Sequence, residues 1–227
     1  MTIKIDKKIV KHEVVKPGEP APGAAPDAQA GVTQMHEKLE RPQMLYGSTY
    51  KIKTPLSEHA LYVTVNDVVL NPGTEHELRR PFEIFINSKN MDHFQWIVAL
   101  TRIVSAVFRK GGDVTFLVEE LRSVFDPRGG YFKKGGKFIP SLVAEIGDVI
   151  EQHLRAIGLL KDQGPDEHQR KLIEEKRAQY AAAKGRTDAN NDGFPEGAQL
   201  CGKCQTKAVV LMDGCMTCLN CGDSKCG

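Results

Sequence analysis

The feature that most restricts what this chain can fold into is a group of six cysteines, all within its last 27 residues. Three CxxC pairs occur, namely Cys201 with Cys204, Cys215 with Cys218, and Cys218 with Cys221. Cys226 follows outside this spacing. One tetrahedral zinc ion takes four thiolates, commonly from two CxxC knuckles. A segment this short buries too little apolar surface to fold alone, so we expect zinc to hold a ribbon-like tail together.

Two partitions of the six thiols are possible, and Cys201 with Cys204 forms the first knuckle in both. In the favoured partition Cys218 and Cys221 complete the site, because Gly222 directly afterwards relieves crowding where backbone amides turn toward the sulfurs. This choice leaves Cys215 and Cys226 free. The other partition uses Cys215 with Cys218 and leaves Cys221 with Cys226, in CGDSKC, as the spare pair.

In the simplest interpretation the two spare thiols have no function and are solvated beside a structural zinc ion. Exposed free cysteines are liable to oxidation, however, and a pair on a short tail suits thiol–disulfide exchange. Lys225 lies beside Cys226 and favours its thiolate electrostatically. We therefore predict a redox function for the pair.

The rest of the composition limits partners and location. A formal net charge of +2 gives no electrostatic reason to expect nucleic acid or a membrane as the main partner. The opening MTIKIDKKIVKHEVV lacks the apolar core of a secretory signal, and no apolar run approaches the roughly 18 residues of a membrane span. We expect a cytoplasmic protein, in which clustered cysteines favour a metal or redox site over a disulfide scaffold.

A nucleic-acid-binding zinc ribbon is the competing interpretation of the tail. Such modules use basic groups for phosphates and aromatic rings for stacking. Acidic residues outnumber basic ones from residue 185 onward, and the ribbon itself has no aromatic residue. We therefore expect no direct contact between the tail and nucleic acid.

Hydrophobic patterning predicts an α+β domain over residues 41–160. The runs TYKIKT, ALYVTVN and PFEIFIN are short, β-branched and partly alternating, which indicates a small antiparallel sheet. Helical periodicity follows in three segments. The first is capped by Ser88 or Asn90 and ended by Gly111, the second is capped by Asp113, and the third begins at Pro140 and ends at Gly158. Strands followed by helices predict a sheet covered by helices on one face.

The remaining segments read as connections. Residues 1–40 contain a charged opening and a Pro/Ala/Gly-rich stretch, typical of a disordered arm and linker. Residues 161–199 combine helix-forming EHQRKLIEEKRAQYAAAK, read as an exposed helix or spacer, with a flexible tether of 15 residues that reaches about 50 Å when extended. The cysteine-rich tail occupies 200–227.

Two blocks of the sequence resemble the C-terminal region of adenosylcobalamin-dependent (class II) ribonucleotide reductases. They are RPQMLYGSTYKIKTP with the following RRPFEIFIN, and the ending EGAQLCGKC to GCMTCLNCGDSKCG. The chain looks like the small subunit of a split reductase. The resemblance implies a ribonucleoside-diphosphate reductase that is active only with a large catalytic chain, because the radical barrel and the adenosylcobalamin site are absent here.

The family also implies a task for the spare cysteines. In these reductases each turnover oxidises an active-site cysteine pair, and a flexible tail carries a second pair that re-reduces it and is itself reduced by thioredoxin or glutaredoxin. Cys215 with Cys226, or Cys221 with Cys226, match that tail pair. The strand and helix domain resembles the family's TSCPD domain, although no TSCPD sequence occurs in this chain. The alternative function is a non-enzymatic zinc-ribbon adaptor that binds protein or nucleic acid.

Other candidate sites have simpler interpretations. The GGYFKKGGKF loop matches no complete nucleotide fingerprint and reads as a solvated basic loop. Asp92 and His93 suit a helix N-terminus better than an acid–base pair. Trp96 is expected in the core or in a docking patch. The loop histidines at positions 36, 59 and 76 are assigned no function.

Overall fold

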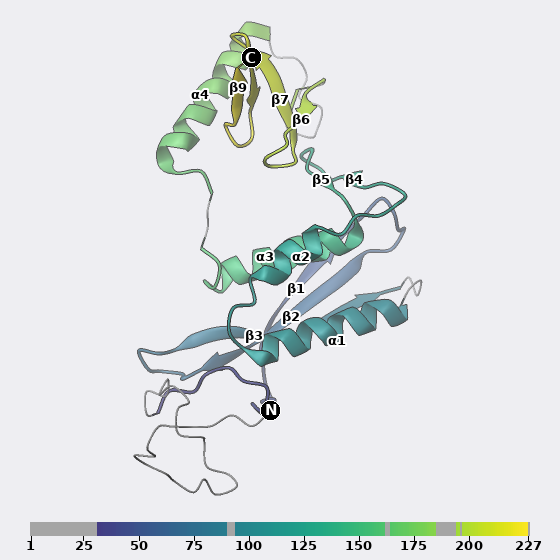
Figure 1. The fold of residues 1–227 in the computed structure, drawn as a ribbon, viewed down its shortest axis with the longest axis vertical. Coiled ribbons are helices and arrows are strands. Elements are labelled where there is room, and N and C mark those ends of the chain that lie inside the picture. Colours follow the sequence, from purple (N-terminus) through teal and green to yellow (C-terminus); the bar gives the residue numbers. More distant parts are fainter. Residues whose placement is uncertain (1–30, 90–93, 162–163, 185–193, 196, 227) are drawn as a thin grey trace, which may run out of the picture. The chain divides into compact units, whose positions relative to one another are not determined.

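The computed structural model describes residues 31–89, 94–161, 164–184, 194–195 and 197–226. The predicted cap at Asn90, the pair Asp92 and His93, and most of the N-terminal arm lie outside these residues. The described elements are three small antiparallel sheets and four helices (Figure 1), so the predicted α+β class is confirmed.

The largest sheet has the order β1-β2-β3, with β1 at Tyr46–Ile52, β2 at Leu61–Leu70 and β3 at Leu78–Ser88. Both pairings are antiparallel, as predicted. The alternation in β2 sends Leu61, Val63 and Val65 into the core, because successive side chains of a strand point to opposite faces. A register shift between Asn66 and Asp67 interrupts the pairing with β3.

Three helices cover one face of this sheet, as expected. They are α1 at Phe94–Lys110, α2 at Phe116–Arg122 and α3 at Leu142–Ala156, and α2 packs beside α3 (Figure 1). Alternate residues of the strands and the apolar stripes of the helices form one buried core. Typical members are Val63, Ile84, Phe108, Val118 and Ile150.

The helix boundaries correct three predictions. Pro140 precedes the third helix, whose N-cap is Ser141: its hydroxyl accepts a hydrogen bond from the Ala144 amide at 3.0 Å. Asp113 does not cap α2 directly, since its carboxylate binds the amide and hydroxyl of Thr115, the N-cap residue. Ser88 ends β3 and is therefore no helix cap.

The glycine-rich excursion contains a short hairpin that the sequence did not predict. Its strands are β4 at Tyr131–Phe132 and β5 at Phe138–Ile139. Two of its three lysines are held by acids of α3: Lys133 lies 2.7 Å from Glu145 and Lys137 lies 2.5 Å from Asp148. The loop was expected to be basic and solvated, but the positive charges of these two lysines are balanced by carboxylates of α3.

The cysteine-rich tail forms the sheet β6-β7-β8-β9. Its strands are β6 at Gln199–Leu200, β7 at Lys207–Met212, β8 at Cys215–Cys218 and β9 at Ser224–Cys226. A short bridge joins Lys137 of the hairpin to Thr206 of the tail, with two backbone hydrogen bonds: from Phe138 N to Gln205 O at 2.7 Å and from Lys207 N to Gly136 O at 2.8 Å.

The predicted helix after residue 164 is present as α4 at Glu167–Lys184, and it packs on the tail. Ile173 is its buried residue and lies against Gly222. The Arg177 Nε atom donates a hydrogen bond to the Leu219 carbonyl at 2.7 Å, and the guanidinium stacks over the Phe194 ring. The helix therefore belongs structurally to the cysteine-rich tail.

The burial of two side chains, Met35 and Trp96, differs from what the sequence around them suggests. Met35, in the stretch assigned to the N-terminal arm, is buried against Val68, Leu70 and Phe82. Trp96 is 70% exposed, which excludes it from the core of the described chain and leaves the docking interpretation.

Candidate metal centre and disulfide

Two tight turns present the four predicted metal ligands. The first turn, after β6, is closed by a hydrogen bond from the Gln205 amide to the Cys201 carbonyl at 2.9 Å. The second follows β8 and is closed by a bond from the Gly222 amide to the Cys218 carbonyl at 2.9 Å. Gly222 has a φ of 76°, a conformation that glycine adopts without a Cβ penalty. This is the position at which the sequence pattern called for glycine.

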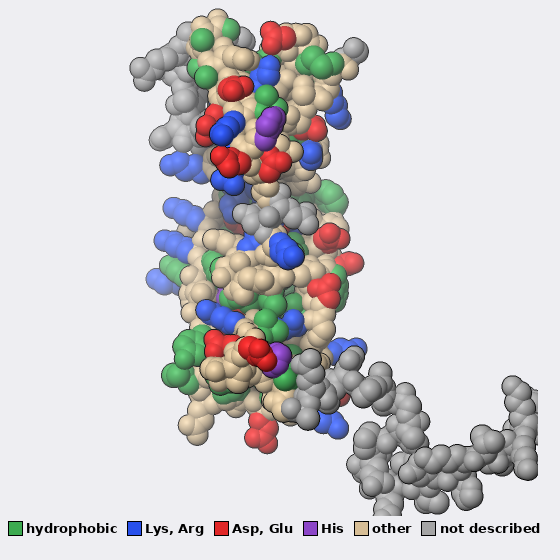
Figure 2. Space-filling view, turned by 90° about the vertical axis from the view of Figure 1, so that its left-hand side faces the viewer, with side chains coloured by type: hydrophobic (Ala, Val, Ile, Leu, Met, Phe, Trp, Pro, Cys, Tyr) green, Lys and Arg blue, Asp and Glu red, His purple; other side chains and the backbone are tan. Residues whose placement is uncertain are grey.

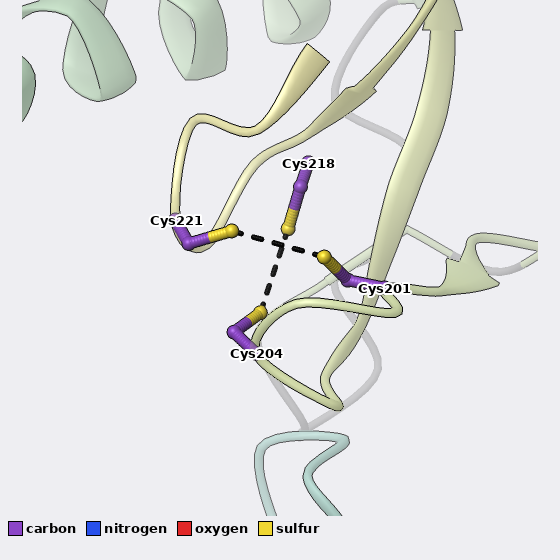
Figure 3. A group of neighbouring side chains, drawn as sticks. All are labelled: Cys201, Cys204, Cys218 and Cys221. Atoms are coloured by element: carbon purple, nitrogen blue, oxygen red, sulfur yellow. Dashed lines mark hydrogen bonds between the residues drawn. The ribbon is translucent and has the colours of Figure 1, made fainter. Parts of the chain in front are cut away.

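The sulfurs of Cys201, Cys204, Cys218 and Cys221 converge on one point (Figure 3) and all lie within 4.8 Å of one another. The Cys201–Cys221 and Cys204–Cys218 sulfur pairs are each 3.7 Å apart. A tetrahedron with Zn–S bonds of about 2.3 Å has edges of about 3.8 Å. The donor set and its spacing therefore fit a zinc ion, and the sulfurs brought together are those of the favoured partition.

The four thiols of the cluster differ in burial and in pKa, and Cys204 is the one whose surroundings favour the thiolate. Cys201 and Cys218 are buried against Ala208, and the other two thiols are half-buried. Burial opposes ionisation of Cys204, but hydrogen bonds from Asn220 and Thr206 outweigh it and lower its pKa to about 7. Burial raises the pKa of Cys218 and of Cys221. A bound cation would reverse these last two shifts, because metal ligation requires thiolates.

The remaining two cysteines form a disulfide between Cys215 and Cys226. They face each other in the register of β8 and β9, next to the pair formed by Met216 and Lys225. All of β9 is exposed, whereas Cys215 is half-buried. The predicted redox pair thus joins two neighbouring strands, with Cys226 exposed on β9 and Cys215 half-buried at the start of β8. Cys221 lies in the thiol cluster instead, and in this arrangement it is not paired with Cys226.

A buried polar network in the α+β domain was missed by sequence reasoning. His153 Nε2 lies 2.8 Å from Asp67 Oδ1, and the Tyr50 hydroxyl lies 3.0 Å from His153 Nδ1. Arg79 donates to the second Asp67 oxygen at 2.7 Å. These residues are far apart in the sequence and form no motif, so no local pattern reveals them. The network joins α3 to all three strands.

The other predicted candidates have ordinary surroundings. The imidazole Nε2 of His76 lies 3.5 Å from the Glu75 carboxylate, and the Lys38 amide donates to the ring of His36. His59 lines a shallow hollow beside three lysines. Within the described residues, the four-thiol cluster is the one group of side chains recognised as fitting a metal.

Comparison with protein families gives a match to the TSCPD domain over residues 33–154. This range covers just over half of the chain and contains the three-stranded sheet, helices α1 and α2, and α3 except for its last two residues. The chain belongs to the TSCPD domain family. TSCPD domains are found at the C-terminus of cobalamin-dependent ribonucleotide reductases. The cysteine-rich tail lies outside the TSCPD match.

Further comparison of the TSCPD protein with curated proteins and with solved structures gives no match. None of the helices described in it is long and apolar enough to cross a membrane.

Proposed function

We propose that this TSCPD protein is the accessory, C-terminal subunit of a cobalamin-dependent (class II) ribonucleoside-diphosphate reductase. In this proposal Cys215 and Cys226 pass electrons from thioredoxin or glutaredoxin to an active-site disulfide of a separate large chain, in the cytoplasm. The observation that carries the proposal is the separation of the six thiols into a four-sulfur cluster and a separate disulfide pair that reaches the surface at Cys226. The family match gives the reductase context.

The redox step is a thiol–disulfide exchange between two pairs. The thiolate of one tail cysteine attacks a sulfur of the large chain's disulfide and forms a mixed disulfide, and the second tail thiol then displaces the large chain's sulfur. Two electrons and two protons pass to the large chain, and the bond between Cys215 and Cys226 forms. A thioredoxin-type dithiol reduces that bond again by the same chemistry.

The four-thiol cluster supports this step without taking part in it. A bound zinc ion would be held by Cys201, Cys204, Cys218 and Cys221, and it would keep the ribbon folded while the pair is reduced. Cys218 ends β8, the strand that begins with Cys215, so the cluster fixes one partner of the pair. The other partner lies on β9, whose exposure lets a second protein reach it. Adenosylcobalamin would be bound by the large chain and would supply the radical.

Delivery of the pair requires the tail to leave its contact with the β4–β5 hairpin. That contact rests on two backbone hydrogen bonds at the surface, each worth about 1 kcal/mol net. Separation is therefore inexpensive, and α4 is expected to leave together with the tail because it packs on it. Of the tether predicted at residues 185–199, Ala198 is buried in the tail and Gln199 begins β6. Docking on the large chain is proposed for the TSCPD domain.

A surface hollow of about 680 Å³ on the TSCPD domain offers a contact for the large chain. Its walls are mostly apolar, and Trp96 and Phe125, which line it, are 70% and 73% exposed. Exposed aromatic side chains around a hollow are typical anchors of protein interfaces. Trp96→Ala and Phe125→Ala are expected to weaken co-purification with the large chain, while Phe132→Ala, an exposed ring on the hairpin, is the matched control. If all three variants co-purified equally with the large chain, this hollow would not be the docking surface.

The decisive experiment measures deoxyribonucleotide formation by the large chain with and without this subunit, using thioredoxin, thioredoxin reductase and NADPH as reductant. Cys226→Ser is expected to retain a single turnover after pre-reduction and to lose multiple turnover, which a small dithiol restores. Ser224→Ala, on the same strand, is the matched control and keeps multiple turnover. Wild-type multiple turnover in both Cys215→Ser and Cys226→Ser would leave only the adaptor function.

A further inference from the structure

The face of the sheet opposite the helices carries two exposed aromatic rings. Tyr62 of β2 is 42% exposed and Phe85 of β3 is 48% exposed. Tyr62 pairs with Asn87 and Thr64 pairs with Phe85, so the two rings are diagonal neighbours on adjacent strands. Such neighbours lie about 7–8 Å apart. Exposed rings on an open antiparallel sheet form a surface on which nucleic-acid bases stack.

Three lysines gather at one end of this face. Lys51 lies directly opposite Tyr62 in the register of β1 and β2, Lys53 follows β1, and Lys89 follows β3. No ion pair links any of them to another residue in the part of the chain that the structure describes. Clustered ammonium groups without carboxylate partners attract anions.

The lysines surround a hollow of about 460 Å³, within the size range of small-molecule sites. Tyr62, Asn87 and His59 also line it, and Glu58 is its one acidic residue. The hollow is therefore net positive, and it is lined by the Tyr62 ring and by the neighbouring Asn87 amide, which both donates and accepts hydrogen bonds. These are the groups that recognise a base, its edge and its phosphates.

We propose that this face binds a nucleoside di- or triphosphate, with the base stacked on Tyr62 and Phe85 and the phosphates on Lys51, Lys53 and Lys89. A single-stranded nucleic acid is disfavoured, because its binding sites track the backbone with a continuous basic groove. Here the positive charge lies at one end only. Toward the other end the same face carries Glu83, which is held by Arg41 at 2.8 Å. The site is independent of the proposed electron transfer.

The test is a titration of the full chain with ATP, followed by ¹H–¹⁵N correlation spectra and by calorimetry. ATP is expected to shift the amide signals of β1, β2 and β3 near Lys51, Tyr62 and Asn87, and its affinity falls as salt is raised. Inorganic triphosphate and adenosine are the separate arms for phosphate and base. Each is expected to bind more weakly than ATP.

Four variants test the residues. Tyr62→Leu and Lys51→Gln are each expected to weaken ATP binding, by about tenfold for the loss of stacking. Phe116→Leu on α2 and Lys110→Gln at the end of α1, which are similarly exposed, are the matched controls and retain wild-type affinity. Unchanged thermal unfolding in Lys51→Gln shows that a loss of binding is local.

Three outcomes overturn the proposal. They are no ATP-dependent shift at millimolar ATP, shifts that persist unchanged in both Tyr62→Leu and Lys51→Gln, and binding of a short oligodeoxythymidylate without binding of ATP. The last result assigns the face to a nucleic-acid strand.

Discussion

His153 of α3 lies with its Nε2 atom 2.8 Å from Oδ1 of Asp67 in β2, and both side chains are almost completely buried. The second Asp67 oxygen accepts a hydrogen bond from Arg79, so removal of this carboxylate takes a partner from the partly exposed Arg79 and from the buried His153. Leaving a buried polar group without its hydrogen-bond partner costs about 1–3 kcal/mol. We expect Asp67→Ala to destabilise the TSCPD domain by about 3 kcal/mol, measured by urea unfolding with circular dichroism.

The control for this prediction is Glu75→Ala, which removes an exposed partner of His76. Exposed ion pairs contribute little, so its unfolding midpoint stays close to that of the wild type. A wild-type midpoint for Asp67→Ala as well would mean that the buried network contributes nothing to stability.

The contact between α4 and the tail is tested by a pair of glycines. Gly222 and Gly214 have φ values of 76° and 80°, so alanine is strained by about 1 kcal/mol at either position. They differ in surroundings: a Cβ at Gly222 would lie 3.1 Å from Ile173 Cγ1, whereas one at Gly214 would meet nothing within 4 Å. We expect Gly222→Ala to speed hydrogen exchange in α4, and Gly214→Ala to leave it unchanged. Equal exchange in both variants would show that Ile173 does not anchor the helix.

Metal loading predicts a specific thiol count. In the reduced protein with one zinc ion, four of the six thiols are ligands, so two are expected to react rapidly with a thiol reagent. Chelation is expected to make all six reactive and to unfold the tail, while the TSCPD domain keeps its cooperative unfolding transition. Cys201→Ser is expected to weaken zinc binding, and Cys226→Ser to leave it unchanged. Six reactive thiols in the zinc-loaded protein would contradict the four-thiolate site.

Much of this organisation could be read from the sequence because its signals are local. Alternation in Leu61, Val63 and Val65 marked a strand with one buried face, and the CxxC spacing with Gly222 indicated which sulfurs converge. Both features depend on neighbours a few residues apart.

The features that escaped sequence analysis depend on residues far apart in the chain. Tyr50 and Asp67 meet at His153, which lies 103 and 86 residues away from them. The apolar stripe of α4 is thin: among its side chains at residues 167–183 only Ile173 is buried, so the packing of this helix on the tail left no periodic signal in the sequence. The strands β4 and β5 have two residues each, too few for alternation to register.

The pair formed by Arg41 and Glu83 predicts how stability responds to acid. The hydrogen bond from Arg41 holds the pKa of Glu83 below its ordinary value of 4.5, against the opposing effect of burial, and Asn66 adds a second hydrogen bond. A carboxyl with a lowered folded-state pKa stabilises the fold above its unfolded pKa, and this contribution is lost as the pH falls through the folded value.

We therefore expect Arg41→Gln to lower stability at neutral pH and to flatten its decline between about pH 5 and pH 3, since Glu83 then titrates closer to its unfolded pKa. Thermal unfolding across that range measures the effect. Arg102→Gln, on the exposed side of α1, is the matched loss of one positive charge and is expected to keep the wild-type slope. The same flattening in both variants would assign the acid response to net charge rather than to the hydrogen bonds at Glu83.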